Sequence, residues 1–285
     1  MTAPLPIEVV VMTRDEAANI GECLASLRGF RRVFVVDSGS ADGTAALAAH
    51  GGATVVPYRW DGRYPKKKQW CLDNLPFAGD WVLFVDADER VTPALEAALR
   101  RAFATPPDCA AFWIEGRYVF LGRRLRFGHR NAKLALLHRR RARFPVQDDL
   151  AVGRMWEVEG HYQPKLDGPA GRLGGWLWHD DRKPLFAWFD RHNRYTDWAA
   201  AMERRSGLAA HEAGHRRLAK AVVARLPLRG LLAFLHSYVW RLGLLDGGPG
   251  FHFAVARGVY YWQAGLKRRA ETEGRHRGGA PGGAG

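Results

Sequence analysis

Long apolar runs and secretion signals are missing from this sequence of 285 residues. The longest apolar candidate, Leu231–Leu245, is interrupted by His236 and Arg241, so no segment reaches the roughly 18 apolar residues that a membrane span needs. The first residues, MTAPLPIEVVVMTRDE, lack the basic start and apolar stretch of a signal peptide. We therefore expect a protein that does not cross a membrane.

Cysteine is also scarce. The chain has three cysteines, Cys23, Cys71 and Cys109, which are odd in number and widely spaced. Neither a disulfide framework nor a clustered zinc site follows from them, and this usage favours a reducing, cytoplasmic compartment.

Negative charge is in short supply, because 43 Lys+Arg face 29 Asp+Glu and the formal net charge is +14. A pI near 10.2 suits three kinds of partner: nucleic acid, an anionic membrane surface, or an acidic small substrate. Charge alone does not choose among them. With 47% hydrophobic and 25% charged residues, the composition is that of a folded globular protein.

The first 115 residues alternate short apolar runs with helical patterns, which predicts a mostly parallel sheet flanked by helices, an α/β fold. The expected strands are Ile7–Met12, Val33–Val36, Ala53–Pro57 and Trp81–Val85. The expected helices are Glu16–Leu27, Gly43–His50, Lys66–Leu75 and a helix from Thr92 to about Phe103. In such sheets ligands bind beyond the carboxyl ends of the strands.

Three regions follow from the change of pattern along the chain. Residues 1–178 read as one α/β domain, in which 110–178 adds short strands separated by Gly/Pro turns. Residues 179–266 read as a helical, aromatic and basic appendage, and 267–285 as a low-complexity, disordered tail.

Two carboxylates follow the fourth expected strand, in the stretch FVDADER. Asp86 and Asp88 are two residues apart, so we expect both to project to the same side. Paired hard oxygen ligands suit Mg²⁺ or Mn²⁺, ions that proteins share with substrate phosphates. A start of the next helix, where acids favour the helix dipole, remains an alternative for the same residues.

Two further strand ends, VVMTRDEAANI and VFVVDSGSADGT, together with FVDADER resemble family 2 inverting glycosyltransferases, which have a GT-A (Rossmann-like) fold. The resemblance implies a nucleotide-sugar donor, with Asp37 at the uracil ring and a divalent metal at Asp86 and Asp88. Among the neighbouring lysines, Lys67 is a candidate for compensating the diphosphate charge. The donor-binding residues expected on this basis are Thr13, Arg14, Glu16, Asp37, Ser38, Ser40, Lys67 and Asp86.

The similarity is closer to one branch, the bacterial lipopolysaccharide-core β-glucosyltransferases. GDWVLFVDADERVTP, HDDRKPLFAWFDRHNRYTDWAA and GLLDGGPGFHFAV carry this resemblance, which is strong over 5–104, moderate over 176–265 and poor between. It implies transfer of a hexose, glucose first, from a UDP-sugar to a glycolipid or lipopolysaccharide-core acceptor. The branch has a His-Glu pair associated with catalysis where this chain has His161-Tyr162.

A general base must therefore come from another acid of that stretch, since inverting transfer needs a carboxylate to take the acceptor proton. The available acids are Asp148, Asp149, Glu157 and Glu159. MWEVEG reads as a strand entering the cleft, so Glu157, followed by Glu159, is the expected base, with Asp88 as a further catalytic acid. An ordinary solvated strand face is the alternative.

Two other functions fit single features. HEAGH at 211–215 matches the H-E-x-x-H zinc metallopeptidase signature, although Gly214 lies inside it. The positive charge fits a nucleic-acid-binding module, but no zinc finger, RNP motif or basic zipper occurs, so we expect no nucleic-acid partner. The basic, aromatic helices after 179 suit attachment to the cytoplasmic face of an anionic membrane.

Overall fold

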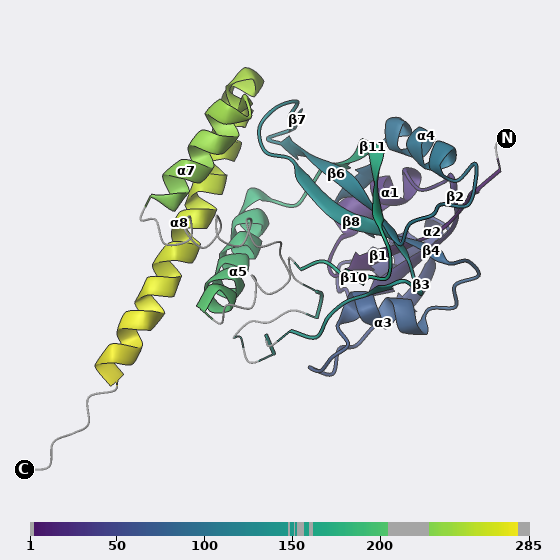
Figure 1. Ribbon diagram of the computed structural model, residues 1–285, viewed down its shortest axis with the longest axis horizontal. Coiled ribbons are helices and arrows are strands. Elements are labelled where there is room, and N and C mark those ends of the chain that lie inside the picture. The colour runs from purple at the N-terminus through teal and green to yellow at the C-terminus, as the bar shows by residue number, and fades with distance from the viewer. Residues whose placement is uncertain are drawn as a thin grey trace, which may run out of the picture. The chain divides into compact units, whose positions relative to one another are not determined.

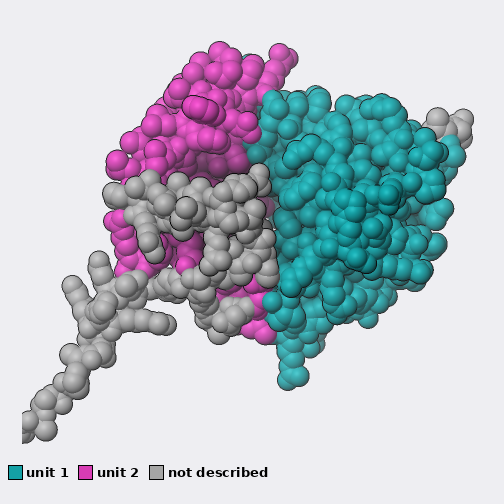
Figure 2. Space-filling model, in the orientation of Figure 1, with its two compact units in different colours: residues 1–125, 130–146, 156–183 teal, residues 126–129, 147–155, 184–285 magenta. Residues whose placement is uncertain are grey.

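The computed structural model describes residues 3–147, 149–150, 152, 157–159, 162–204 and 228–278. The chain divides into two compact units (Figure 2). The first unit comprises residues 1–125, 130–146 and 156–183. The second comprises 126–129, 147–155 and 184–285, so the boundary expected at 178/179 falls at 183/184.

The first unit is built on a nine-stranded sheet (Figure 1). Eight strands follow the order β3-β2-β1-β4-β8-β6-β11-β5, and the ninth, β7, pairs with β6. The pairs β3–β2, β2–β1, β1–β4 and β6–β11 are parallel. Its strands are β1 (Leu5–Thr13), β2 (Phe30–Asp37), β3 (Thr54–Pro57), β4 (Trp81–Asp86), β5 (Glu89–Val91), β6 (Ala111–Phe120), β7 (Arg123–Arg124), β8 (Asn131–His138) and β11 (Ala170–His179). A separate two-stranded sheet pairs β9 (Ala142–Arg143) with β10 (Lys165–Leu166).

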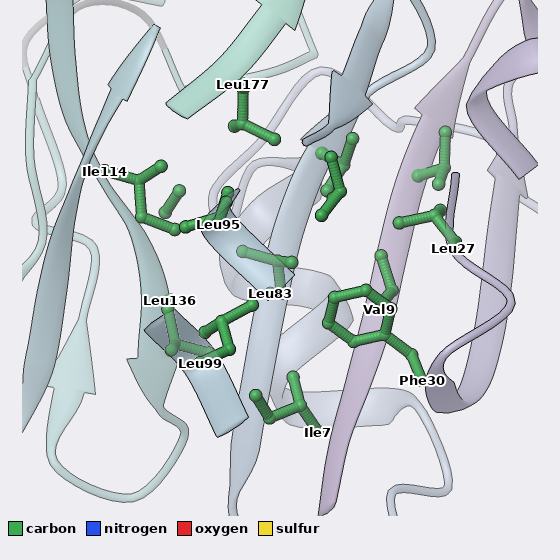
Figure 3. Packing of buried hydrophobic residues seen from close by; sticks show 14 of the residues in the cluster. Ile7, Val9, Leu27, Phe30, Leu83, Leu95, Leu99, Ile114, Leu136 and Leu177 are labelled. Carbon is green, nitrogen blue, oxygen red and sulfur yellow. The ribbon is translucent and has the colours of Figure 1, made fainter. Parts of the chain in front are cut away.

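Helices cover both faces of this sheet. The buried residues of α1 (Ala17–Ala25), α2 (Thr44–His50) and α4 (Pro93–Ala102) belong to one hydrophobic cluster, and those of α3 (Lys67–Asn74) belong to the other. Along β1, Val9 and Val11 face the first cluster and Val10 the second, as the strand period of two requires. Figure 3 shows the first cluster, where Leu83 and Leu136 of the sheet pack near Leu95 and Leu99.

All four expected strands and all four expected helices are confirmed, with boundaries that differ by a few residues. Thr92 caps α4 as expected, because its hydroxyl accepts the Leu95 N–H at 3.2 Å. The α/β prediction with a mostly parallel sheet is therefore correct.

The second unit is helical: α5 (Leu185–Arg204), α7 (Arg229–Leu235), a π-helical turn η2 (His236–Trp240), a 3₁₀ turn η3 (Gly243–Asp246) and α8 (Gly247–Gly278). α8 lies beside α5 and α7 (Figure 1). The predicted disordered tail from 267 is wrong as far as Gly278, because α8 continues to that residue. Residues 279–285 lie outside the described part. No helix among the described residues is both long and apolar enough to cross a membrane.

A β-bulge interrupts β11 near its middle. The register of β11 against β6 shifts between Arg172 and Trp176. Gly175, inside this shift, has a φ of +80°, and a Cβ there would lie 2.4 Å from the backbone nitrogen of Leu95. Only glycine combines this backbone conformation with so close an approach. The bulge therefore depends on Gly175.

We expect Gly175→Ala to lower the free energy of unfolding by about 2–4 kcal/mol, from backbone strain plus overpacking against α4. Gly174→Ala is the matched control, because a Cβ at Gly174 would meet no heavy atom within 4 Å. Urea unfolding followed by circular dichroism measures both. Equal stability of the two variants would contradict this explanation of the bulge.

Candidate active site at the carboxyl edge of the sheet

Three neighbouring parallel strands end in polar residues at one edge of the sheet. In the pairing register, Thr13 of β1 lies opposite Asp37 of β2, and Met12 lies opposite Asp86 of β4. β1 runs between β2 and β4, so the β2 and β4 ends are roughly 10 Å apart. The structure thus brings the predicted residues at 13, 37 and 86 to one edge.

Asp37 is a buried carboxylate held by three hydrogen bonds. Thr13 donates its hydroxyl proton at 2.8 Å, and Ser40 donates from its backbone N–H at 2.9 Å and its hydroxyl at 2.5 Å. Burial raises the pKa of Asp37, but the hydrogen bonds from Ser40 and Thr13 and the nearby Lys67 outweigh it and hold the pKa below its usual value. Asp37 is therefore a fixed anion that can accept a further N–H.

Lys67 is buried directly behind this carboxylate. Its ammonium donates to the Ser38 hydroxyl at 2.5 Å and to the Thr13 carbonyl at 3.3 Å, and it pairs with Glu157 at 3.2 Å. The Ser38 hydroxyl also donates to Glu157. Burial lowers the pKa of Lys67, and Glu157 opposes that shift. Glu157 therefore lies at the β2 end, among the predicted donor residues.

Residues 157–159 form the cap of helix α3, and the strand predicted over MWEVEG is wrong there, because these described residues form a bend. The Glu157 carbonyl accepts the Lys67 N–H at 2.7 Å. The Glu159 carboxylate accepts the N–H groups of Lys68 at 2.7 Å and Gln69 at 2.8 Å. Three N–H groups that the first turn would otherwise leave unpaired are thus satisfied.

Both oxygens of the Glu159 side chain accept these backbone bonds, and the residue is buried. Burial raises the pKa of Glu159 against the hydrogen bonds from Gln69 and Lys68. Its expected role as an alternative general base is therefore not supported, since a base needs a carboxylate oxygen free to reach the acceptor hydroxyl.

Glu16 and Arg14, also predicted to bind the donor, have different surroundings. Glu16 pairs with Lys183 at 2.5 Å and accepts from Asn19 at 2.8 Å, so its carboxylate is already occupied. Asn19 also accepts the Arg182 N–H at 2.9 Å, which fixes the loop after β11 to α1. Arg14 is exposed beside this edge.

Asp86 lies beside a partly buried lysine, Lys133, that the sequence analysis missed. The Lys133 ammonium, from β8, contacts Asp86 at 2.8 Å and Glu89 at 2.7 Å. Burial raises the pKa of Glu89, and Lys133 only partly opposes this shift. For Lys133, burial lowers the pKa, but Asp86 and Glu89 raise it by more, so its pKa is shifted upward. Lys133 therefore stays charged and compensates two acids at once.

Asp88 contacts a histidine instead of Lys133. The His179 Nε2 atom lies 3.1 Å from an Asp88 carboxylate oxygen, and the Asp180 N–H donates to the Asp88 carbonyl at 2.7 Å. Asp86 and Asp88 thus have separate protein partners, and their expected sharing of one metal stays a prediction.

The donor set at Asp88 fits a small divalent cation that keeps other ligands for a substrate. Mg²⁺ and Mn²⁺ both accept a carboxylate oxygen alongside phosphate oxygens and water, and the imidazole nitrogen favours Mn²⁺ of the two, because Mg²⁺ prefers oxygen ligands. Within the described residues no group of three or more His, Cys, Asp and Glu side chains could hold a metal alone.

Aromatic and arginine side chains of β6, β7 and β11 contact one another near His179. The Arg117 guanidinium lies 3.7 Å from the centre of the Trp176 ring, and that of Arg124 lies 5.3 Å from the Trp178 ring. Tyr118 contacts the His179 ring at 5.4 Å. Trp176 and Trp178 alternate with Leu177 and His179, so the two tryptophans lie on the other face of β11 from His179. Arg117 also pairs with Glu115 at 2.7 Å, whereas Arg124 is exposed.

Several predicted features lie outside the described residues: Asp148, His161 and the HEAGH segment at 211–215. Asp149 is described; it is buried, and it accepts the Trp198 indole N–H at 3.1 Å. This carboxylate belongs to the second unit.

The family follows from a match of residues 8–153, just over half of the chain, to the model described as "Glycosyl transferase family 2". The chain belongs to glycosyl transferase family 2. The matched residues contain the strand ends at 13, 37 and 86–88, which agrees with the predicted GT-A-type α/β fold and with an enzyme that transfers a sugar.

Among the relatives of this glycosyltransferase is "Lipopolysaccharide core biosynthesis glycosyltransferase LpsC" of Rhizobium meliloti (strain 1021). The two are 25% identical over 275 residues, which covers 91% of this chain and 90% of LpsC. An "Uncharacterized glycosyltransferase" of Rickettsia felis is 31% identical over 129 residues, so the match covers 44% of this chain and 41% of that protein.

Solved structures give partial likenesses. A glucosyl-3-phosphoglycerate synthase from Mycobacterium tuberculosis, in complex with Mn²⁺, UDP-glucose and glycerol 3-phosphate, is 26% identical over 41% of this glycosyltransferase and 45% of that chain, with a TM-score of 0.31. Another complex of that synthase covers 70% of this chain and 79% of its own at 20% identity, with a TM-score of 0.41.

We expect Glu159→Gln to lower the free energy of unfolding by about 1–2 kcal/mol, because a neutral amide offers only one acceptor oxygen to the two N–H groups of α3. Glu22→Gln is a matched control at an exposed carboxylate that pairs with Arg182 at 3.3 Å. Urea unfolding measures both, and we expect the control to change by less than about 0.5 kcal/mol. A Glu159→Gln variant as stable as the wild type would refute the capping role.

Proposed function

We propose that this glycosyltransferase moves a hexose, glucose first, from a UDP-sugar to a glycolipid acceptor of the lipopolysaccharide-core type, with inversion at the anomeric carbon. The carrying observation is the placement of Asp37 and Asp86 at strand ends separated by one strand, with Asp88 two residues beyond Asp86. That separation of roughly 10 Å suits a nucleotide whose base lies at one carboxylate and whose diphosphate lies near the other.

The uracil-binding role of Asp37 rests on its ionised state. A carboxylate accepts the N3–H of a uracil ring, and the hydrogen bonds from Thr13 and Ser40 keep Asp37 charged and in one orientation. Lys67 and Ser38 stand behind it and fix the loop that follows β2.

The metal is Mg²⁺ or Mn²⁺, and Asp88 and His179 would hold it. Such an ion neutralises the negative charge that develops on a leaving diphosphate. Asp86 is half-exposed and held by Lys133, so we assign it to the donor and not to the metal. This revises the expectation that both aspartates bind the ion.

The glycolipid acceptor rests on the relationship to LpsC, which extends over nearly all of both chains. A lipid-linked acceptor would place the reaction at the inner face of the cytoplasmic membrane.

Thermal unfolding with UDP, with and without Mn²⁺, tests the donor and metal roles. Binding at 100 times Kd adds about 2.7 kcal/mol of stability, so a measurable rise in Tm is expected for the wild type. Asp88→Asn and His179→Ala should lose the Mn²⁺-dependent part of that rise. Asp108→Asn, in an exposed loop, is the control and should keep it. A Mn²⁺-independent wild type, or unaffected Asp88 and His179 variants, would contradict the metal assignment.

Glu157 was predicted as the general base, and its contacts favour a donor-side role instead. We expect Glu157→Gln to raise KM for the UDP-sugar by about tenfold, because Lys67 and Ser38 lose their anionic partner. A base role would instead lower kcat by about 10²–10⁴-fold at nearly constant KM. Steady-state kinetics at varied donor concentration separates the two results.

A further inference from the structure

The second unit carries a continuous exposed apolar surface on α7, η2, η3 and α8. The connection between α7 and α8 is the most exposed part, since Trp240 is 81% exposed and Leu245 is 56% exposed. We call this set the hairpin surface. Its members, all exposed, are Leu228, Leu231, Leu232, Leu235, Val239, Trp240, Leu242, Leu244, Leu245, Phe251, Val255, Val259, Trp262 and Leu266.

The α8 part of the hairpin surface follows the helical period. Its exposed apolar residues, Phe251, Val255, Val259, Trp262 and Leu266, recur at intervals of four, four, three and four, so they form one stripe along the helix. The residues that pack inward, such as Phe253, Ala254 and Ala264, lie off this stripe. The stripe borders α7, which Phe251 and Trp262 contact, and its side chains remain partly exposed.

The hairpin itself is rigidly built, so its exposure does not come from a loose end. α7 and α8 approach closely at two glycines, because a Cβ on Gly230 would lie 2.7 Å from the Gly258 carbonyl oxygen. Phe251 of α8 contacts the rings of Phe234 at 6.0 Å and Tyr238 at 5.6 Å. The apolar residues are therefore presented in a fixed arrangement.

Basic residues outnumber acids around the hairpin surface. Residues 228–278 contain eight Arg and Lys side chains and three acids, Asp246, Glu271 and Glu273. Three of the cations, Arg229, Lys267 and Arg268, pair with Glu203 or Asp197 of α5. The Asp246 carboxylate accepts the N–H groups of Arg126 at 3.0 Å and Phe127 at 2.8 Å, so both of its oxygens bond within the second unit. Arg241 at the connection and Arg269 beyond Leu266 are both exposed. A partner of this surface must therefore combine an apolar interior with negative charge at its boundary.

We propose that the hairpin surface docks onto the interface of a membrane that contains anionic phospholipid, with Trp240 and Leu245 entering the acyl boundary and Arg241 and Arg269 at the headgroups. An interface of this kind accepts a mixed apolar, Trp-bearing and basic surface because it buries the apolar groups and neutralises the charges. A second copy of this chain would bring like charges together around the same residues. The inference deepens the proposed function and rests on a lipid-linked acceptor.

Co-sedimentation of the full-length protein with vesicles tests this docking. We expect binding to phosphatidylcholine vesicles containing phosphatidylglycerol, weakened about tenfold without the anionic lipid or in high salt, in line with the two exposed arginines. Leu245→Glu should reduce binding to the anionic vesicles by about tenfold or more, because a charge replaces a buried apolar group. Leu47→Glu is the matched control, since Leu47 is 47% exposed on α2 of the first unit, and it should bind as the wild type does.

Three results would overturn the proposal: a wild type that ignores anionic vesicles, a Leu245→Glu variant that binds like Leu47→Glu, or a wild-type dimer that Leu245→Glu converts to a monomer. Light scattering during size-exclusion chromatography detects the last. Vesicle binding needs no donor and UDP-dependent stabilisation needs no vesicle. A failure of the docking surface is therefore distinguishable from a failure of the proposed sugar transfer.

Discussion

Carboxylates at the edge of a buried sheet cost free energy unless cations or hydrogen-bond donors lie beside them. The buried Lys67 and the partly buried Lys133 meet this requirement here. Lys67 stands behind the end of β2, where it contacts Ser38 and Glu157. Lys133 reaches from β8 to Asp86 and Glu89 beyond β4. The positions of the acids depend on these lysines, and so does the geometry of the candidate site.

The ends of β2 and β4 are two separate parts of the candidate site. At the β2 end, hydroxyl and N–H donors hold the carboxylate of Asp37 in one orientation. The β4 end holds Asp88 beside His179, and the bulge at Gly175 precedes this histidine on β11. An orientation-fixing site for a base and a cation-binding site for a diphosphate are the two parts that nucleotide-sugar transfer requires.

The second unit obeys a different constraint. Its helices bury one side of α8 against α5 and α7, and they leave a stripe from Phe251 to Leu266 exposed together with the hairpin connection. A helix whose apolar residues cover more than the side that packs inward has surface left for another apolar environment. The exposed Arg241 and Arg269 beside this surface favour an environment with negative charge.

The sequence by itself determined the strand–helix order, the family and the strand-end residues at 13, 37 and 86–88, because apolar periodicity and short turns are local properties. Tertiary structure alone decided which groups stand beside those ends. Lys133 and His179 arrive from β8 and β11, far along the chain, through sheet pairing that no local pattern encodes. Long-range packing also places Glu159 at the cap of α3 and Glu157 at the β2 end. The contacts of an acid in an irregular segment depend on the elements that pack against it, and these are distant in sequence.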